Sequence, residues 1–342
     1  MHVLLHKIGD SVYGMRRILP PRTRRACRLA LHSALDLSIS PQVRPSDALV
    51  ISGFMRSGTT WLQEAAAEVL NGKSVFEPLG SPELPDGMYS TLLPAETDWN
   101  YRHVFMPYAE RDFNHYPQLK LYLEQSLRGR VGGHWVYRSR RRLSESRRRR
   151  VILKEVRAQL CLHAIQETFQ VPILHVYRDP RAIIASLNKA QWDKLYHTMS
   201  LRAHFLEPRD GRAEFFEAWR DDIEQIDALS VPERIAAYWS LTERYVEHCR
   251  ANLGTRIIMV GYEECFRDSA TCMSAILDDL HRKPVHVDEA VINRDSRTTI
   301  AERRGTSFDA RVYSWKKDLS PHEIDAITAV VERFGLQDRL IS

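Results

Sequence analysis

A short glycine-containing loop between an apolar stretch and an amphipathic one constrains this chain more than any other feature. Residues 47–53 read Asp-Ala-Leu-Val-Ile-Ser-Gly, an apolar run ending in glycine that is typical of a buried strand. Residues 60–70 then carry apolar side chains at helical spacing, and the Asn71-Gly72 pair predicts the end of that helix. A loop between a buried strand and a helix N-terminus gathers backbone N–H groups and the positive end of the helix dipole. The loop therefore predicts a binding site for phosphate or sulfate.

The loop sequence, Gly53-Phe-Met-Arg-Ser-Gly-Thr-Thr60, matches the phosphate-binding pattern G-x-x-x-x-G-K-[ST] except that Thr59 replaces the lysine. In kinases and GTPases that lysine and Mg²⁺ neutralise the β- and γ-phosphates. Here the strong cation in the loop is Arg56, and no apolar strand ending in aspartate stands out to hold a metal. The loop therefore favours a donor that carries less charge on the transferred group and needs no metal. Taken alone, it is also compatible with an ordinary strand-to-helix turn.

Strand and helix patterns alternate along the rest of the chain. Further strands are predicted at 151–153, 171–177 and 256–260, and further helices at 161–169, 181–189, 233–253, 270–280 and 321–334. The strands are apolar throughout, which is typical of a parallel sheet covered on both faces. Residues 81–107 predict an irregular excursion over a binding face. We expect residues 46–342 to form one three-layer α/β/α domain with a central, mostly parallel sheet and a P-loop-like nucleotide-binding core.

Arginines cluster at two places. The first cluster lies on a predicted helix over 15–35, so residues 1–45 are expected to form a basic helical arm that packs on the domain or lies on an anionic membrane surface. The second, over 138–157, holds nine arginines and Lys154. It has three interpretations: a solvated loop, a site for an anionic glycan, or a nucleic-acid site. We expect no nucleic-acid binding, because the run lacks interleaved aromatic residues.

The cysteines and the apolar runs indicate where in the cell the protein is expected. None of the five cysteines forms a CxxC pair, so we expect free buried thiols in a reducing compartment and no metal site. No apolar run approaches the roughly 20 residues of a membrane span, and the first 19 residues carry charges and a Gly-Asp break. The expected location is cytoplasmic, with peripheral membrane contact through the basic arm as an alternative.

Two motifs together give a specific resemblance. Residues 56–62, Arg-Ser-Gly-Thr-Thr-Trp-Leu, resemble the 5′-phosphosulfate loop of the sulfotransferases that use 3′-phosphoadenosine 5′-phosphosulfate (PAPS). Residues 176–187, Val-Tyr-Arg-Asp-Pro-Arg-Ala-Ile-Ile-Ala-Ser-Leu, resemble the element of that family that binds the 3′-phosphate. A guanidinium fork, a hydroxyl and a helix N-terminus suit a dianionic phosphate. The resemblance implies PAPS as co-substrate, held by Arg56, Ser57, Gly58, Thr59, Thr60, Trp61, Arg178 and Ser186.

Two weaker similarities follow further along the chain. Val-Gly-Tyr-Glu-Glu at 260–264 is similar to a family segment whose tyrosine lies near the adenine, which implies that role for Tyr262. Arg303, Arg304 and Gly305 resemble a family loop that closes on the 3′-phosphate. In both places an ordinary surface role is an equally good interpretation.

The general base depends on the branch of the family. The cytosolic enzymes for small molecules use a histidine in a Lys-x-His stretch, but here Val156 follows Lys154 at that spacing. The Golgi and bacterial enzymes for carbohydrates use a glutamate, and Phe-Glu-Pro at 76–78 resembles a segment of that branch. We therefore expect Glu77 to take the proton of the acceptor. Lys154 and Arg56 are expected to stabilise charge on the bridging oxygen.

Other roles stay open at this point. Glu155 and His115 are alternative bases, and Glu77 could simply cap the turn before Pro78. The predicted function is metal-independent sulfuryl transfer from PAPS to a hydroxyl, on a glycan or glycolipid rather than a phenol or steroid. The alternatives are a sulfotransferase for a small non-carbohydrate alcohol, a P-loop nucleotide kinase or phosphotransferase, and a basic module that binds polyanions. The interpretation requires that one nucleotide can span from Ser57 to Ser186.

Overall fold

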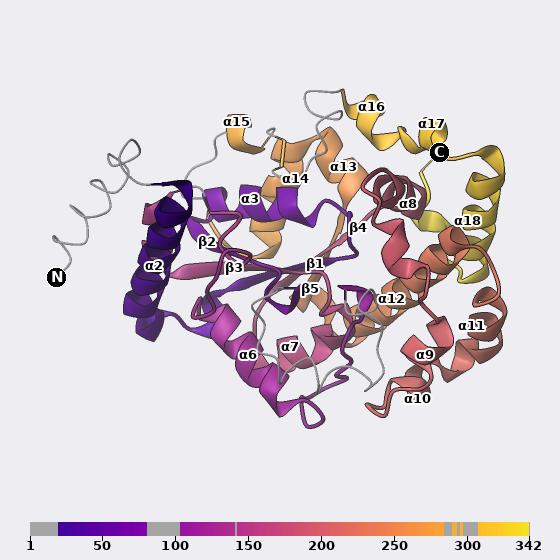
Figure 1. Ribbon diagram of the computed structural model, residues 1–342, viewed down its shortest axis with the longest axis horizontal. Coiled ribbons are helices and arrows are strands. Elements are labelled where there is room, and N and C mark those ends of the chain that lie inside the picture. The colour runs from indigo at the N-terminus through magenta and orange to yellow at the C-terminus, as the bar shows by residue number, and fades with distance from the viewer. Residues whose placement is uncertain are drawn as a thin grey trace.

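A five-stranded parallel sheet forms the centre of the structure, a computed structural model that describes residues 20–80, 103–140, 142–283, 289–292, 295–296 and 307–341 (Figure 1). Among these residues the strand order is β2-β3-β1-β4-β5, and every neighbouring pair is parallel. The strands are β1 (Leu49–Gly53), β2 (Gly72–Phe76), β3 (Arg150–Glu155), β4 (Ile173–Tyr177) and β5 (Ile257–Gly261). Nearly every strand residue is buried, which explains why the strand sequences are apolar without alternation.

Helices cover both faces of the sheet (Figure 1). Leu49 and Ile51 of β1 point to the face that carries α3 (Thr59–Val69), α13 (Tyr262–Arg267) and α14 (Ser269–Asp279). Val50, between them, belongs to the larger cluster on the opposite face, with α6 (Pro117–Leu127), α7 (Leu162–Phe169) and α12 (Val231–Leu253). The predicted three-layer α/β/α fold is confirmed.

The remaining helices lie at the sheet ends or farther out. Against α12 pack α8 (Pro180–Lys189) and α18 (Pro321–Arg333). The others are α2 (Pro21–Ile39), α9 (Leu201–Phe205), α10 (Arg212–Phe216), α11 (Arg220–Ile226), α15 (Glu289–Ile292), α16 (Phe308–Val312) and α17 (Trp315–Asp318). No helix in the described ranges is long and apolar enough to cross a membrane.

The four predicted strands and the seven predicted helices each correspond to an element of the described residues, with bounds that differ by a few residues. One element was interpreted wrongly: Gly72 was taken only as the end of a helix, but it begins β2. The sequence Gly-Lys-Ser-Val-Phe lacks an apolar pattern, because Lys73 is buried through an ion pair with Asp36 at 3.0 Å rather than through apolar packing. The short helices α6 and α9–α11 were not predicted either.

Helix α2 is anchored in the domain by a buried cluster of charges. Asp36 accepts hydrogen bonds from Lys73 Nζ at 3.0 Å and from Arg140 Nη1 at 2.7 Å, and all three side chains are buried. Leu35 and Ile39 on the same helix are buried as well. The apolar face of this helix is therefore used inside the protein, and contact of the basic arm with a membrane stays a prediction.

Three arginines of the basic run over 138–157 have structural roles. Arg140 also donates to Ser74 O at 2.8 Å, while Arg148 Nη1 donates to Gly72 O at 2.9 Å. Arg150 Nη1 lies 3.3 Å from Leu70 O, its acceptor at the end of α3. The interpretation as a solvated loop was wrong for these arginines, because carbonyl groups at the ends of α3 and the start of β2 need donors and the guanidinium groups supply them.

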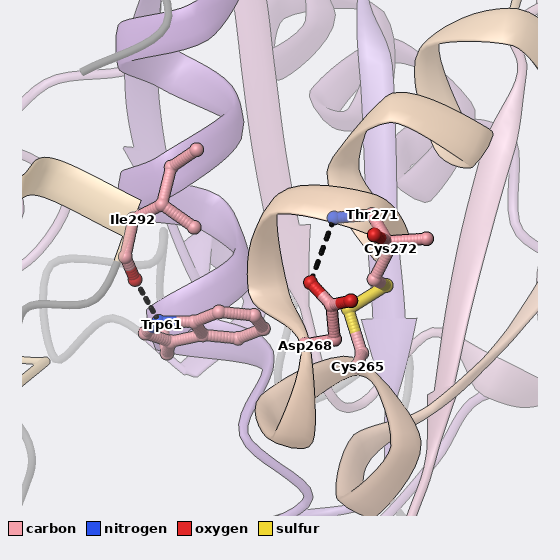
Figure 2. Close-up of a disulfide and its surroundings, with 6 residues drawn as sticks. All are labelled: Trp61, Cys265, Asp268, Thr271, Cys272 and Ile292. Atoms are coloured by element: carbon pink, nitrogen blue, oxygen red, sulfur yellow. Dashed lines mark hydrogen bonds between the residues drawn. A yellow bond between two sulfur atoms is a disulfide. The ribbon is translucent and has the colours of Figure 1, made fainter. Parts of the chain in front are cut away.

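The expectation of five free thiols was also wrong. Cys265 of α13 and Cys272 of α14 form a disulfide, with their Cα atoms 5.0 Å apart (Figure 2). The pairing depends on the turn at Asp268, whose side chain accepts a hydrogen bond from Thr271 N at 3.0 Å and so caps α14. Spacing alone did not reveal it, because the seven-residue separation crosses two helices. Cys27, Cys161 and Cys249 are free thiols.

Candidate active site

A cavity of about 330 Å³ lies at the carboxyl ends of the strands. Every strand contributes residues from the segment that follows it, as expected for ligand sites in open α/β sheets. The lining residues discussed below are Arg56, Gly58, Thr59, Thr60, Trp61, Phe76, Glu77, Trp135, Arg138, Lys154, Val156, Arg157, Arg178, Ser186, Trp192, Tyr262, Phe266 and Arg311. The candidate site thus combines segments that are far apart in the sequence.

The loop after β1 has the backbone of an anion cradle. Gly58 has φ +91° and precedes the first turn of α3, and no side chain caps that turn. The first N–H groups of a helix have no partner within the helix, so those of α3 are oriented for a ligand. A Cβ on Gly58 would collide with the ring of Tyr262, so this position requires glycine. The buried Ser57 hydroxyl makes no hydrogen bond within the described residues, which fits a site built for an anionic group.

The two predicted phosphate-binding motifs are in direct contact. Arg56 Nε donates to Ser186 Oγ at 2.9 Å, and Arg178 Nη1 donates to the Arg56 carbonyl at 2.9 Å. The Arg178 guanidinium lies 4.5 Å above the centre of the Tyr262 ring. Its Nε is buried and makes no hydrogen bond within the described part of the chain. Ser57 and Ser186 therefore lie on adjoining segments, joined through Arg56.

Local capping explains how Arg178 is oriented. Asp179 accepts a hydrogen bond from Arg181 N at 2.8 Å and caps α8, whose first residue is Pro180. Arg181 Nη2 pairs with the same carboxylate at 2.6 Å. Asp179 and Arg181 thus form a helix cap with an internal ion pair. It leaves Arg178, one residue earlier, at the end of β4 and in the cavity wall.

Glu77 lies between two cations. Its Oε1 pairs with Lys154 Nζ, and its Oε2 lies 3.4 Å from Arg157 Nη1. Lys154 Nζ also donates to Thr60 Oγ1 at 3.0 Å and thus connects the carboxylate to the phosphate loop. Burial alone would raise the pKa of Glu77, but the charges of Lys154 and Arg157 outweigh it and lower the pKa. Glu77 is therefore an ionised carboxylate in the cavity.

The backbone also holds Glu77 in an uncommon conformation. Its φ is +38°, in the left-handed region that costs a residue with a side chain on the order of 1–3 kcal/mol. Two contacts fix it: Glu77 N donates to Lys154 O at 2.8 Å, and Trp135 Nε1 donates to Glu77 O at 3.1 Å. Arg56 has a positive φ as well, +72°. Such conformations cluster at functional sites, where the surrounding structure imposes them.

The alternative bases lie elsewhere. Glu155 is buried below the cavity and accepts hydrogen bonds from Leu79 N at 2.8 Å and Arg157 N at 3.0 Å. Burial raises the pKa of Glu155 to about 7. His115 is exposed on the segment before α6 and does not line the cavity. Val156 does line it, at the position where a histidine would stand in the cytosolic branch. Of these side chains, only Glu77 combines a carboxylate with a place in the cavity wall.

The family model described as the sulfotransferase domain matches residues 46–332 of this chain. The chain belongs to the sulfotransferase family. No match occurs among curated protein sequences. The solved structures that resemble this sulfotransferase include the sulfotransferase domain of the Synechococcus PCC 7002 olefin synthase, at 17% identity and a TM-score of 0.43, with coverage of 84% of this chain and 94% of that one.

Two other solved structures are comparable in similarity. Retinol dehydratase in complex with retinol and PAP is 14% identical, with a TM-score of 0.42 and coverage of 91% of this sulfotransferase and 87% of that chain. Sulfotransferase STF1 from Mycobacterium tuberculosis H37Rv is 15% identical, with a TM-score of 0.35 and coverage of 90% and 89%.

Several residues of this sulfotransferase site were not found from the sequence. Trp135 and Trp192 line the cavity but belong to no motif, and nothing in their local pattern distinguishes them from surface residues. Arg138, from the basic run over 138–157, lines the cavity as well. Trp61 was assigned to the nucleotide site; it lines the cavity while its Nε1 donates to Ile292 O at 2.8 Å (Figure 2). Arg303, Arg304 and Gly305 lie outside the described residues, so their assignment stays a prediction.

Proposed function

We propose that this sulfotransferase transfers the sulfuryl group of PAPS to a carbohydrate or glycoconjugate hydroxyl, with Glu77 as the general base. The observation that carries the proposal is the contact between the two phosphate-binding motifs, through Arg56 Nε and Ser186 Oγ at 2.9 Å. One motif alone would suit many phosphorylated ligands. Two adjoining motifs suit a nucleotide that is charged at both its 3′ and 5′ positions.

Each part of the donor has matching residues. Arg178 and Ser186 would bind the 3′-phosphate, and Ser57 with the first turn of α3 would bind the 5′-phosphosulfate. The adenine would lie against Tyr262, which stacks on Phe266 with ring centres 5.5 Å apart and planes at 11°. Trp61 meets Phe266 edge to face at 6.0 Å and supports that wall. All these residues except Ser57 line the cavity.

The reaction is an in-line displacement at sulfur. The acceptor oxygen forms a bond to sulfur while the bond between sulfur and the bridging phosphate oxygen breaks, which releases adenosine 3′,5′-bisphosphate. The hydroxyl proton passes to the Glu77 carboxylate. The negative charge that develops on the bridging oxygen is stabilised by Lys154 and Arg56. No change in oxidation state occurs, and the proton and charge are balanced.

Lys154 couples the donor site to the base. It contacts Thr60 Oγ1 on the phosphate loop at 3.0 Å and also pairs with Glu77. A Lys154 that turns toward an anionic donor would leave Glu77 paired with Arg157 alone. Since the two cations lower the pKa of Glu77, loss of one would make the carboxylate more basic. Donor binding would thus prepare the base for the acceptor.

The proposal of a carbohydrate acceptor is supported by the identity of the base and by the aromatic residues of the cavity wall. A glutamate at position 77 and a valine at position 156 match the carbohydrate branch, as inferred from the sequence. Trp135 and Trp192 add flat apolar surfaces to the cavity wall. A small non-carbohydrate alcohol is the alternative acceptor. A panel of both classes with PAPS distinguishes them.

The experiment is an assay of purified protein with PAPS and this acceptor panel, in which adenosine 3′,5′-bisphosphate and sulfated product are measured together. The expected result is equimolar formation of both without added metal. Absence of bisphosphate above background with every acceptor would contradict the proposal. Mg²⁺-dependent transfer from ATP, with no binding of adenosine 3′,5′-bisphosphate, would support the phosphotransferase alternative instead.

The location within the cell stays a prediction. A cytoplasmic location was expected from five unpaired thiols, but Cys265 and Cys272 form a disulfide. Disulfides persist mainly in oxidising compartments, so this pair argues against the cytoplasmic expectation.

A further inference from the structure

The stretch of chain that follows α18 is anchored on α12. Arg244 Nη2 of that helix donates to Gly335 O at 3.1 Å. Further along, Arg339 Nη2 pairs with Glu247 Oε1 of the same helix at 3.1 Å. We call residues 337–341 the C-terminal segment. These two contacts hold it against the domain.

The C-terminal segment makes two hydrogen bonds to the turn that carries Arg178. Ile341 N donates to Asp179 Oδ2 at 3.0 Å, and Ile341 O accepts from Arg181 Nη2 at 2.6 Å. Arg181 Nη2 also donates to Asp179 Oδ2 at 2.6 Å, so the three residues form one closed set of contacts. Asp179 is fully buried, and hydrogen bonds to a carboxylate are stronger than those between neutral groups. Ile341 is therefore part of the cap at the start of α8.

The residues on either side of Arg178 are also held by rings and guanidinium groups outside the cavity. The guanidinium of Arg339 lies 4.1 Å from the centre of the ring of Tyr177, the last residue of β4. The guanidinium of Arg181 lies 4.0 Å from the centre of the buried Trp315 ring. Contacts of this kind are attractive and limit the movement of both partners. Tyr177 and Arg181 are not in the described cavity lining, so their contacts support the turn from behind.

The position of the Arg178 guanidinium depends on this turn. Within the described residues it donates to Arg56 O at 2.9 Å and lies over the ring of Tyr262. Its Nε lies 3.8 Å from Glu263 Oε1, which is beyond a hydrogen bond. Glu263 Oε1 accepts instead from Asp179 N at 3.2 Å. The nearest carboxylate thus holds the backbone of the next residue rather than the guanidinium itself.

We propose that the C-terminal segment positions Arg178 for the 3′-phosphate of the donor, through the hydrogen bond from Ile341 N to Asp179. The inference rests on the proposed function, which assigns Arg178 to that phosphate. It adds a segment that follows residues 46–332, the range that the family model matches. None of its residues is in the described cavity lining, so it acts through Arg178 and not on the nucleotide. Without it, the 3′-phosphate loses a fixed partner, while the 5′ end of the donor keeps the loop after β1.

The test removes the backbone donor at position 341. Ile341→Pro lacks the N–H that Asp179 accepts, and Leu340, at φ −85° and ψ 133°, already has a conformation suited to a residue before proline. Affinities for adenosine 3′,5′-bisphosphate and adenosine 5′-monophosphate are measured by calorimetry. We expect Ile341→Pro to weaken binding of the bisphosphate about 3–20-fold and that of the monophosphate less than about twofold, because one charge-assisted hydrogen bond is lost.

Turnover distinguishes positioning from a general loss of stability. In Ile341→Pro, KM for PAPS should rise by a similar factor, while kcat at saturating PAPS stays within about twofold of the wild type. A fold that is merely destabilised would lower the active fraction, and hence kcat, at unchanged KM. Ile341→Ala keeps the N–H and is the matched control, with affinity for both nucleotides within about twofold of the wild type.

Hydrogen exchange of the wild type gives a measurement that needs no variant, and it decides the matter if Ile341→Pro does not fold. If the segment favours binding of the 3′-phosphate, the bound phosphate must favour the docked segment by the same factor. The Ile341 amide should therefore exchange about 3–20-fold more slowly with the bisphosphate bound than with the monophosphate bound.

Three results would overturn the inference. They are equal exchange rates of the Ile341 amide with the two nucleotides, a folded Ile341→Pro protein that binds both nucleotides as the wild type does, and an equal loss of affinity for both. If the wild type does not bind adenosine 3′,5′-bisphosphate at all, the proposed function fails instead, so the two failures are distinguishable.

Discussion

The donor half and the acceptor half of the cavity differ in how they are encoded. The donor half consists of short segments in which functional residues lie close in sequence, such as 56–61 after β1 and 178–186 after β4. The proposed acceptor half brings together Phe76, Trp135, Arg138 and Trp192 from three separate segments. In the proposed donor half, backbone N–H groups and helix N-termini would bind phosphate, and their positions follow from local sequence. The acceptor half depends on side chains placed by tertiary packing.

The difference suggests that donor binding and acceptor choice can be altered separately. A change in the donor half should impair binding of every nucleotide ligand, whatever the acceptor. A change in the acceptor half should alter which acceptor is used and leave nucleotide binding intact. Glu77 lies at the boundary, since it belongs to the β2 segment yet pairs with Lys154, which contacts the phosphate loop. The following experiments test this division, from the largest expected effect to the smallest.

Replacement of the proposed base should have the largest effect on catalysis. Glu77→Gln removes the proton acceptor and should lower kcat about 10²–10⁴-fold. Affinity for adenosine 3′,5′-bisphosphate should change only a few-fold. Because the pKa of Glu77 is held below its ordinary value of 4.5, the wild-type carboxylate should stay ionised from neutral pH down to about that value. Single-turnover kinetics and calorimetry measure the two quantities, and a variant that retains wild-type kcat would exclude Glu77 as the base.

Removal of the 3′-phosphate contact should have the next largest effect. Arg178→Ala should weaken binding of adenosine 3′,5′-bisphosphate by about 2–4 kcal/mol, the range for truncation of a desolvated charge pair. Binding of adenosine 5′-monophosphate, which lacks the 3′-phosphate, should be much less affected. Titration calorimetry with both nucleotides measures the difference, with Arg250→Ala on the exposed face of α12 as the control. Equal losses for the two nucleotides would mean that Arg178 does not contact the 3′-phosphate.

The buried Glu155 should make stability depend on pH. The pKa of Glu155 is raised from 4.5 to about 7 by burial, so the folded protein holds this proton up to a higher pH than the unfolded chain. Ionisation therefore destabilises the fold progressively as pH rises from about 4.5 to 7. Glu155→Gln cannot ionise, and over this window its free energy of unfolding should gain roughly 3 kcal/mol relative to the wild type.

Denaturant titrations at several pH values measure this effect. The exposed Glu332→Gln on α18 is the control and should show no relative gain. A constant difference between wild type and Glu155→Gln over the whole range would show that Glu155 does not titrate there.

Removal of the Cys265–Cys272 disulfide, beside the proposed adenine site, should have the smallest effect. Cys265 lies on α13 between Tyr262 and Phe266, so its bond to Cys272 restrains the helix that carries both rings. Cys272→Ser should weaken binding of adenosine 3′,5′-bisphosphate a few-fold, and dithiothreitol should weaken the wild type to the same level. Cys27→Ser, which alters a free thiol, should do neither. Nucleotide binding by the wild type that is insensitive to reduction would mean that α13 is held by packing alone.

The sequence predicts the parallel sheet, the order of its main elements and the donor segments, because apolar strands and phosphate-binding loops have local signatures. It does not reveal β2, because Lys73 is buried by pairing with Asp36, which lies 37 residues earlier in the chain. It does not reveal the structural roles of Arg140, Arg148 and Arg150, which depend on carbonyl groups of distant segments. The disulfide likewise depends on a turn that the cysteine spacing does not specify.

The charge cluster around Asp36 shows that the segment needed for folding is longer than the segment that lines the cavity. The sulfotransferase domain begins at residue 46, ten positions after Asp36. A protein shortened to that boundary would keep every residue of the cavity but lose Asp36, the carboxylate that pairs with the buried Lys73 and Arg140 side chains. An orphaned partner of a buried ion pair costs about 3–5 kcal/mol, a large share of the 5–15 kcal/mol by which a whole domain is stable. The smallest cooperative unit of this enzyme therefore starts at helix α2.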